Sequence, residues 1–110
     1  MNMKRAILEM GTGNDLHGGD YTKAAVRAVQ DALHHSSLDF VKTLKIDKNR
    51  LTINVTIGIQ KPEEVDNQKV KDSLPVGTVS VIATKGGLDV KNIEEGDVMV
   101  IANAAVEVLL

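Results

Sequence analysis

Residues 51–59 read LTINVTIGI, and this stretch decides the fold class. Its side chains alternate without a break between apolar and polar, so that each kind lies on its own side of an extended chain. The apolar set is Leu51, Ile53, Val55, Ile57 and Ile59. Strict alternation with period two indicates a β-strand that buries one face. The rest of the chain must therefore supply a layer that covers this face.

The covering layer is an amphipathic helix that begins near Asp20. Apolar side chains recur there at steps of three and four residues, which is the pattern of one helical face. Asp20 is a suitable N-cap, because its carboxylate can accept a hydrogen bond from a free N–H of the first turn. We expect the two apolar faces to form the core, through Ile53, Val55 and Ile57 on the strand and Val26, Val29 and Leu33 on the helix.

Similar patterns predict the remaining elements. They are strands over residues 5–10, 78–84 and 97–110 and a short helix from Pro62 to about Ser73. The first strand is expected to stop at Gly11 and Gly13, since glycine interrupts regular structure. The last strand is expected to bend near Asn103. Residues 39–46 fit either a last helical turn or an additional strand.

The element order β-α-β-α-β-β predicts an α+β fold with a single mixed sheet and two helices packed on one face. A chain of 110 residues has the length of one domain, so we assign residues 1–110 to a single domain. Two helices cannot cover both faces of such a sheet. Aliphatic side chains are nevertheless expected on the second face, at Ile7, Ile82, Met99, Ile101 and Leu109. Burial against another subunit is the simplest solution, so we expect a homo-oligomer.

Composition excludes several classes of function. The net charge is −2 and Tyr21 and Phe40 are the two aromatic residues, so the chain has neither the basic footprint nor the stacking surface of a nucleic-acid-binding protein. The sequence has no apolar run long enough to span a membrane and no signal-peptide pattern. The absence of cysteine suits a reducing compartment. We therefore expect a cytoplasmic protein.

One segment combines the residue types that chemistry requires. Residues Gly11–Gly19 read GTGNDLHGG, with one acid and one imidazole among four glycines. In an extended chain, Asp15 and His17 project to the same side. Together they can bind a divalent metal, act as an oriented general base, or hydrogen-bond each other in a rigid turn. Glycine lets a ligand approach the backbone closely, which makes candidate ligand-binding positions of Gly11, Gly13 and Gly18.

Three further polar residues interrupt apolar strands. Glu9 and Glu107 can form a ligand or acid–base site with His17 if their strands are neighbours. Alternatively, they lie on a solvated face or pair with a cation such as Arg5. Asn103 stands between two alanines, where it either shapes a bulge or lines a pocket.

The string GTGNDLHG resembles the signature G-x-G-x-D-x-H-G of a family of conserved hypothetical proteins, Lin-named, which occurs in bacteria and in plants. The similarity extends over nearly the whole chain and includes the segments VTIGIQKPEEVD, KGGL and ANAAV. The resemblance implies that the glycine-rich loop is the functional site, with Asp15 and His17 as its chemical groups. It does not name a reaction.

A shorter resemblance concerns methylerythritol cyclodiphosphate synthase, whose G-x-D-x-H string is matched by Gly13, Asp15 and His17. It implies a divalent metal bound by the Asp and the His at a trimer interface, and a chorismate-mutase-like sheet with helices on one side. That family takes its third metal ligand from a histidine in a following helical segment. His34 and His35 are the candidates, but the predicted helix is about 20 Å long and they lie at its far end. A metal would then have fewer protein ligands or would share ligands with a neighbouring subunit.

Two classes of function follow from the sequence. The first is an oligomeric enzyme or metal-dependent protein that acts on a small polar or anionic metabolite, with Asp15 and His17 as catalytic residues or metal ligands. The second is a non-catalytic ligand-binding or assembly module, in which the glycine-rich loop is structural.

Overall fold

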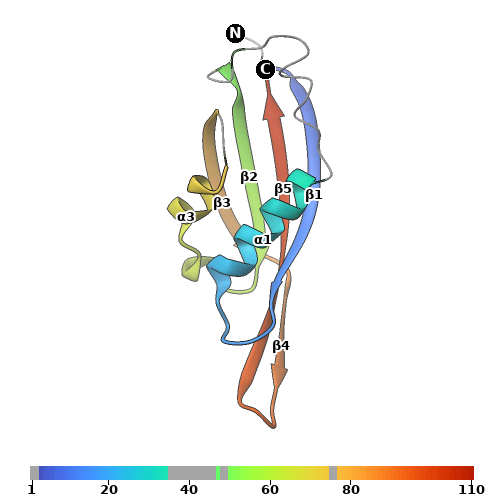
Figure 1. Cartoon of the computed structure of the whole chain (residues 1–110), viewed down its shortest axis with the longest axis vertical. Coiled ribbons are helices and arrows are strands. Elements are labelled where there is room, and N and C mark those ends of the chain that lie inside the picture. Colours follow the sequence, from blue (N-terminus) through green and yellow to red (C-terminus); the bar gives the residue numbers. More distant parts are fainter. Residues whose placement is uncertain (1–2, 35–46, 48–49, 75–76) are drawn as a thin grey trace.

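The structure, a computed structural model, describes residues 3–34, 47, 50–74 and 77–110. Five strands and two α-helices follow one another along these residues (Figure 1). In chain order the elements are β1 (Arg5–Asp15), α1 (Tyr21–His34), β2 (Thr52–Ile59), the 3-10 helix η2 (Pro62–Glu64), α3 (Asn67–Asp72), β3 (Thr78–Lys85), β4 (Leu88–Asn92) and β5 (Asp97–Leu109). The ambiguous residues 39–46 lie outside the described residues.

The strands form one mixed sheet in the order β1-β5-β2-β3, and β4 also pairs with β5. Strands β1, β2 and β4 each run antiparallel to β5, whereas β2 and β3 are parallel. A parallel pair needs a crossover connection, and η2 and α3 lie in that connection. The predicted α+β class with a single mixed sheet is confirmed, with one strand more than predicted, because β4 was not recognised in the short segment after Gly87.

Both α-helices cover the same face of the sheet (Figure 1). Helix α1 packs on β1 and β5, and α3 packs on β3 and on α1. The predicted core is confirmed for four of its residues, since Ile53, Val55, Ile57 and Val29 are at most 1% exposed. Val26 and Leu33 lie at the margin of this core and are partly buried.

The first strand does not stop at Gly11 and Gly13, as predicted, but continues to Asp15. Both glycines face α1. A Cβ atom at Gly11 would overlap the backbone of Ala28 and Ala32, and one at Gly13 would overlap the backbone of Ala24 and Ala28. The absence of a side chain therefore lets strand and helix backbones touch, which is a packing role for this pair of glycines.

The short helix predicted from Pro62 to Ser73 is divided in two. The 3-10 helix η2 ends at Glu64, and α3 begins again after Asp66. The Asp66 carboxylate accepts hydrogen bonds from the backbone N–H groups of Gln68 and Lys69, which caps the new helix. The predicted N-cap of α1 is confirmed, because the Asp20 carboxylate accepts from the N–H of Lys23 at 3.0 Å.

Strand β5 changes its partner midway and carries a projecting hairpin. It pairs with β2 as far as Asn103, and from Ile101 toward its beginning it pairs with β4. The hairpin β4–β5 extends beyond the rest of the sheet (Figure 1). The predicted bulge at Asn103 is wrong, since the pairing of β5 with β1 keeps its register from Ile7 to Asp15. Asn103 has a regular partner on each side, Thr12 on β1 and Gly58 on β2.

The face of the sheet that points away from α1 carries none of the described helices, and we refer to it as the uncovered face. Four of the five aliphatic residues expected there do alternate with the buried set: Ile82, Met99, Ile101 and Leu109. Ile7 was expected there too, but it packs against the core, because it lies on the same side of β1 as Gly11 and Gly13 and is opposite Val108.

We predict that Gly13→Ala destabilises the protein by about 2–3 kcal/mol, because the added methyl group must displace helix backbone rather than a side chain. Urea unfolding followed by circular dichroism measures this loss. Gly58→Ala is the matched control, since its Cβ would meet its nearest neighbour at 3.6 Å. Equal stabilities of the two variants would contradict the packing role of Gly13.

Candidate functional site

The glycine-rich segment is shorter as a loop than the sequence suggested, because residues 11–15 belong to β1. The turn that remains runs from Leu16 to Asp20 and connects β1 with α1. Gly18 and Gly19 have φ values of 93° and 62°, which residues other than glycine rarely adopt. These two glycines thus shape the turn, whereas Gly11 and Gly13 contact α1.

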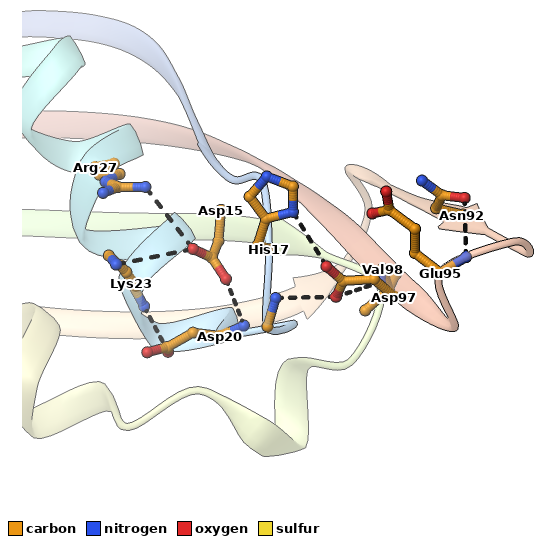
Figure 2. A network of polar contacts seen from close by, with 10 residues as sticks. Asp15, His17, Asp20, Lys23, Arg27, Asn92, Glu95, Asp97 and Val98 are labelled. Atoms are coloured by element: carbon orange, nitrogen blue, oxygen red, sulfur yellow. Dashed lines mark hydrogen bonds and ion pairs between the residues drawn. The ribbon is translucent and has the colours of Figure 1, made fainter.

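Asp15 ends β1 on the side that faces α1 and is 4% exposed (Figure 2). Its Oδ2 atom accepts a hydrogen bond from the backbone N–H of Asp20 at 2.9 Å. Its Oδ1 atom lies 3.9 Å from Lys23 Nζ and 3.9 Å from a terminal nitrogen of Arg27. A buried carboxylate requires hydrogen bonds and opposite charge, and Asp15 has both within its own turn and helix. The contacts of Asp15 are those of a residue that closes the turn.

His17 points away from Asp15 and toward the hairpin (Figure 2). Its side chain is 79% exposed, and its Nδ1 atom lies 3.1 Å from Oδ2 of Asp97, at the beginning of β5. The other oxygen of Asp97 accepts hydrogen bonds from the backbone N–H groups of Gly18 at 3.0 Å and Val98 at 2.8 Å. These N–H groups, followed by His17, hold the pKa of Asp97 below its usual value. Asp97 is therefore a fixed carboxylate.

A third group, Glu95, completes a cluster with His17 and Asp97. One ligand atom of each of the three side chains can be chosen so that all lie within 4.8 Å of one another. Glu95 belongs to the turn of the hairpin, where its backbone N–H donates to the side chain of Asn92 at 3.4 Å. An imidazole and two carboxylates are suitable ligands for a divalent metal.

A second contact fixes the hairpin against the beginning of α1. The hydroxyl of Tyr21 donates to Oδ2 of Asp89, on β4, at 2.6 Å. Burial, followed by this hydrogen bond, raises the pKa of Tyr21 to about 12. Together with Asp97, this contact determines where the hairpin stands relative to the turn.

The turn and the hairpin enclose a cleft of about 610 Å³. It is lined by Leu16 and His17 on one side and by residues 90–95 and 97–99 on the other. Three carboxylates face this cleft, from Glu94, Glu95 and Asp97, against one ammonium group from Lys91. Its electrostatic field therefore favours a cation and disfavours a free anion.

The other predicted site residues lie elsewhere. Glu9 and Glu107 belong to neighbouring strands, but Glu9 is opposite Val106 and Glu107 is opposite Leu8, so the two acids point to opposite faces. Glu107 pairs with Arg5 at 2.7 Å, the alternative that the sequence had left open, and this partner lowers its pKa.

Asn103 lines a trough on the uncovered face, again apart from His17. His34 ends α1, at the opposite end of the helix from the turn. His35 lies outside the described residues.

Sequence reasoning therefore proposed His17 as a site residue and missed Glu95 and Asp97, which the structure brings close to it. Those two acids stand in the run EEGD, which indicates a turn between strands and nothing more. About 80 residues separate Asp97 from His17 along the chain, and only the pairing of β4 and β1 with β5 brings them together. No spacing rule connects side chains that meet in this way.

Fold and turn define an α+β protein whose glycine-rich β1–α1 connection abuts a projecting hairpin. A family model described as "Conserved hypothetical protein (Lin0512_fam)" matches residues 5–108, and the chain belongs to this family. The chain is also similar to a solved structure described as an FtsZ-like protein of unknown function from Nostoc punctiforme, with 37% identity and a TM-score of 0.88. That match covers 100% of this chain and 98% of the other. No curated protein matches.

Among the described residues, no helix has the length and apolar character needed to cross a membrane.

We predict that Asp15→Ala lowers the free energy of unfolding by about 1–3 kcal/mol, since it leaves the N–H of Asp20 without its acceptor. Chemical denaturation measures the loss. Asp31→Ala is the control. The Asp31 carboxylate also accepts a hydrogen bond from a backbone N–H, that of Thr12, but it is more exposed, so its removal should cost less. A variant at Asp15 as stable as the wild type would show that Asp15 has no structural role.

Proposed function

We propose that the chain binds a divalent metal ion through His17, Glu95 and Asp97, and through this ion a small polar or anionic metabolite in the adjacent cleft. The observation that carries the proposal is the convergence of the three side chains, from a turn and a hairpin far apart in sequence, to within 4.8 Å. An enzyme or metal-dependent protein was the first class of function expected from the sequence. The proposal keeps that class and changes the ligand set.

The chemistry of the three groups supports this choice. One nitrogen and two carboxylate oxygens leave open coordination positions on Mn²⁺, Fe²⁺ or Zn²⁺, which a water molecule or a metabolite can fill. Asp97 is oriented for this task, since the N–H groups of Gly18 and Val98 both bind its Oδ1 atom. Hydrogen bonds of this kind fix the orientation of a ligating carboxylate.

The charge of the cleft supports a metal as the first ligand. A free anion would meet Glu94, Glu95 and Asp97, whereas a divalent cation neutralises two of these charges and offers positive charge in their place. The volume of about 610 Å³ falls in the range of small-molecule sites. In this proposal Lys91 adds a second positive contact for the metabolite.

The proposal gives Asp15 and His17 different roles. His17 is the candidate metal ligand or general base, because it is exposed to the cleft. Asp15 supports the turn that carries His17 and does not itself touch metal or metabolite. We propose a cytoplasmic location, which the absence of cysteine suits.

We predict that Mn²⁺ or Zn²⁺ binds to the wild type in isothermal titration calorimetry and raises its melting temperature. Asp97→Asn and His17→Ala should each weaken this binding at least tenfold, since each removes a ligand. In pulsed electron paramagnetic resonance, Mn²⁺ bound to the wild type should show a coupled imidazole nitrogen that is lost in His17→Ala.

Glu94→Gln is the matched control, because it removes one negative charge from the same cleft and leaves the cluster of three intact. Its affinity should stay within about threefold of the wild type. An equal loss in Glu94→Gln and Asp97→Asn would mean diffuse attraction by acidic residues and would overturn the metal site. Failure of the wild type to bind either ion at millimolar concentration would overturn it as well.

A further inference from the structure

The uncovered face of the sheet has a ridge-and-trough relief that a single chain leaves open to solvent. Two adjacent rows of side chains cross its four strands. In the first row the register sets Met10, Ala105, Thr56 and Ile82 side by side, and in the second it sets Thr12, Asn103, Gly58 and Thr84 side by side. The first row has the small residues Ala105 and Thr56 in the middle, and the second has Asn103 and Gly58 there.

The large residues of the first row stand at its two ends. Met10 on β1 is 70% exposed and Ile82 on β3 is 65% exposed. Beside Met10 lies a trough of about 490 Å³, whose lining includes Ala105, Gly58 and Thr84 and also Asp31 of α1. The same surface thus has a protruding apolar side chain, Met10, and a hollow that can receive such a side chain.

The uncovered face is also nearly free of charge. Among the described residues of β1, β2, β3 and the part of β5 that pairs with β2, the charged side chains on this face are Arg5 and Glu107, and these neutralise each other at 2.7 Å. A nucleic acid or an anionic membrane would require unpaired cations here. An identical face with so few charges meets little repulsion, although Asp31 lines the trough and each chain carries a net charge of −2.

We infer that a second copy of this chain packs on the uncovered face, with the protruding Met10 of each copy in the trough of the other. A two-fold axis between the two sheets brings the same patch of both copies together, so the patch must complement itself. The ridge and the trough meet that requirement in shape. Asn103 meets it in hydrogen bonding, because its amide is both donor and acceptor.

The oligomeric state tests this interface directly. Native mass spectrometry and sedimentation at micromolar concentration should give a dimer of 11.8 kDa chains for the wild type. Met10→Lys should raise the dissociation constant at least about 100-fold, because it introduces two buried charges per dimer. Its circular dichroism should remain that of the wild type, since Met10 is exposed in the single chain. Ile93→Lys, at a position that is 91% exposed in the turn of the hairpin, should leave the dimer unchanged.

Cross-linking tests the orientation of the two copies. The chain contains no cysteine, so Asn103→Cys introduces a single thiol on the uncovered face. Mild oxidation should link the two chains of this variant through a disulfide and leave Ile93→Cys without an intermolecular disulfide. A monomeric wild type overturns the inference. So does an oligomer that Met10→Lys leaves intact, because the copies would then meet elsewhere. Neither result affects the metal site, whose ligands lie outside the trough.

Discussion

The contact between β1 and α1 is the constraint on which the rest of this structure depends. Gly11 and Gly13 bring the strand backbone against the alanines of the helix, where no larger residue fits. The distance between the two elements is therefore set by backbone atoms, which cannot adjust as side chains do. The turn from Leu16 to Asp20 must close this narrow gap, and the carboxylate of Asp15 closes it. This turn then fixes the position of His17.

The hairpin supplies the other half of the candidate site by a change of strand partner. Where β2 ends, β4 takes its position beside β5, and the two strands continue as a hairpin. A two-stranded ribbon is only marginally stable by itself. Its contacts with the turn are therefore also its support: Asp97 binds the N–H of Gly18 and the ring of His17, and Asp89 binds the hydroxyl of Tyr21. The proposed metal ligands thus lie at a joint that the fold needs in any case.

Sequence reasoning succeeded where structure is local. The alternation over residues 51–59 and the helical period after Asp20 each reflect one element and one buried face, and the structure confirms both. Sequence reasoning was wrong about Gly11 and Gly13. A glycine can indicate either a flexible loop or a close contact between backbones, and the sequence alone does not distinguish the two. The pairing of His17 with Asp97 could not be predicted, since it results from the order of the strands. The alanines of α1, which recur every four residues, were the one signal that could have indicated the packing role.

The signature G-x-G-x-D-x-H-G therefore combines two physical requirements within one short string. Its first glycines and its aspartate have buried partners in α1 and in the turn, so the fold constrains them. Its histidine has an exposed ring and one partner on another element, so stability constrains it little. Replacement of a residue that is dispensable for folding leaves the scaffold intact, whereas replacement of a buried partner does not. Because the N–H groups of Gly18 and Val98 hold Asp97 without the imidazole, the place of His17 beside two carboxylates agrees with its proposed role as a metal ligand.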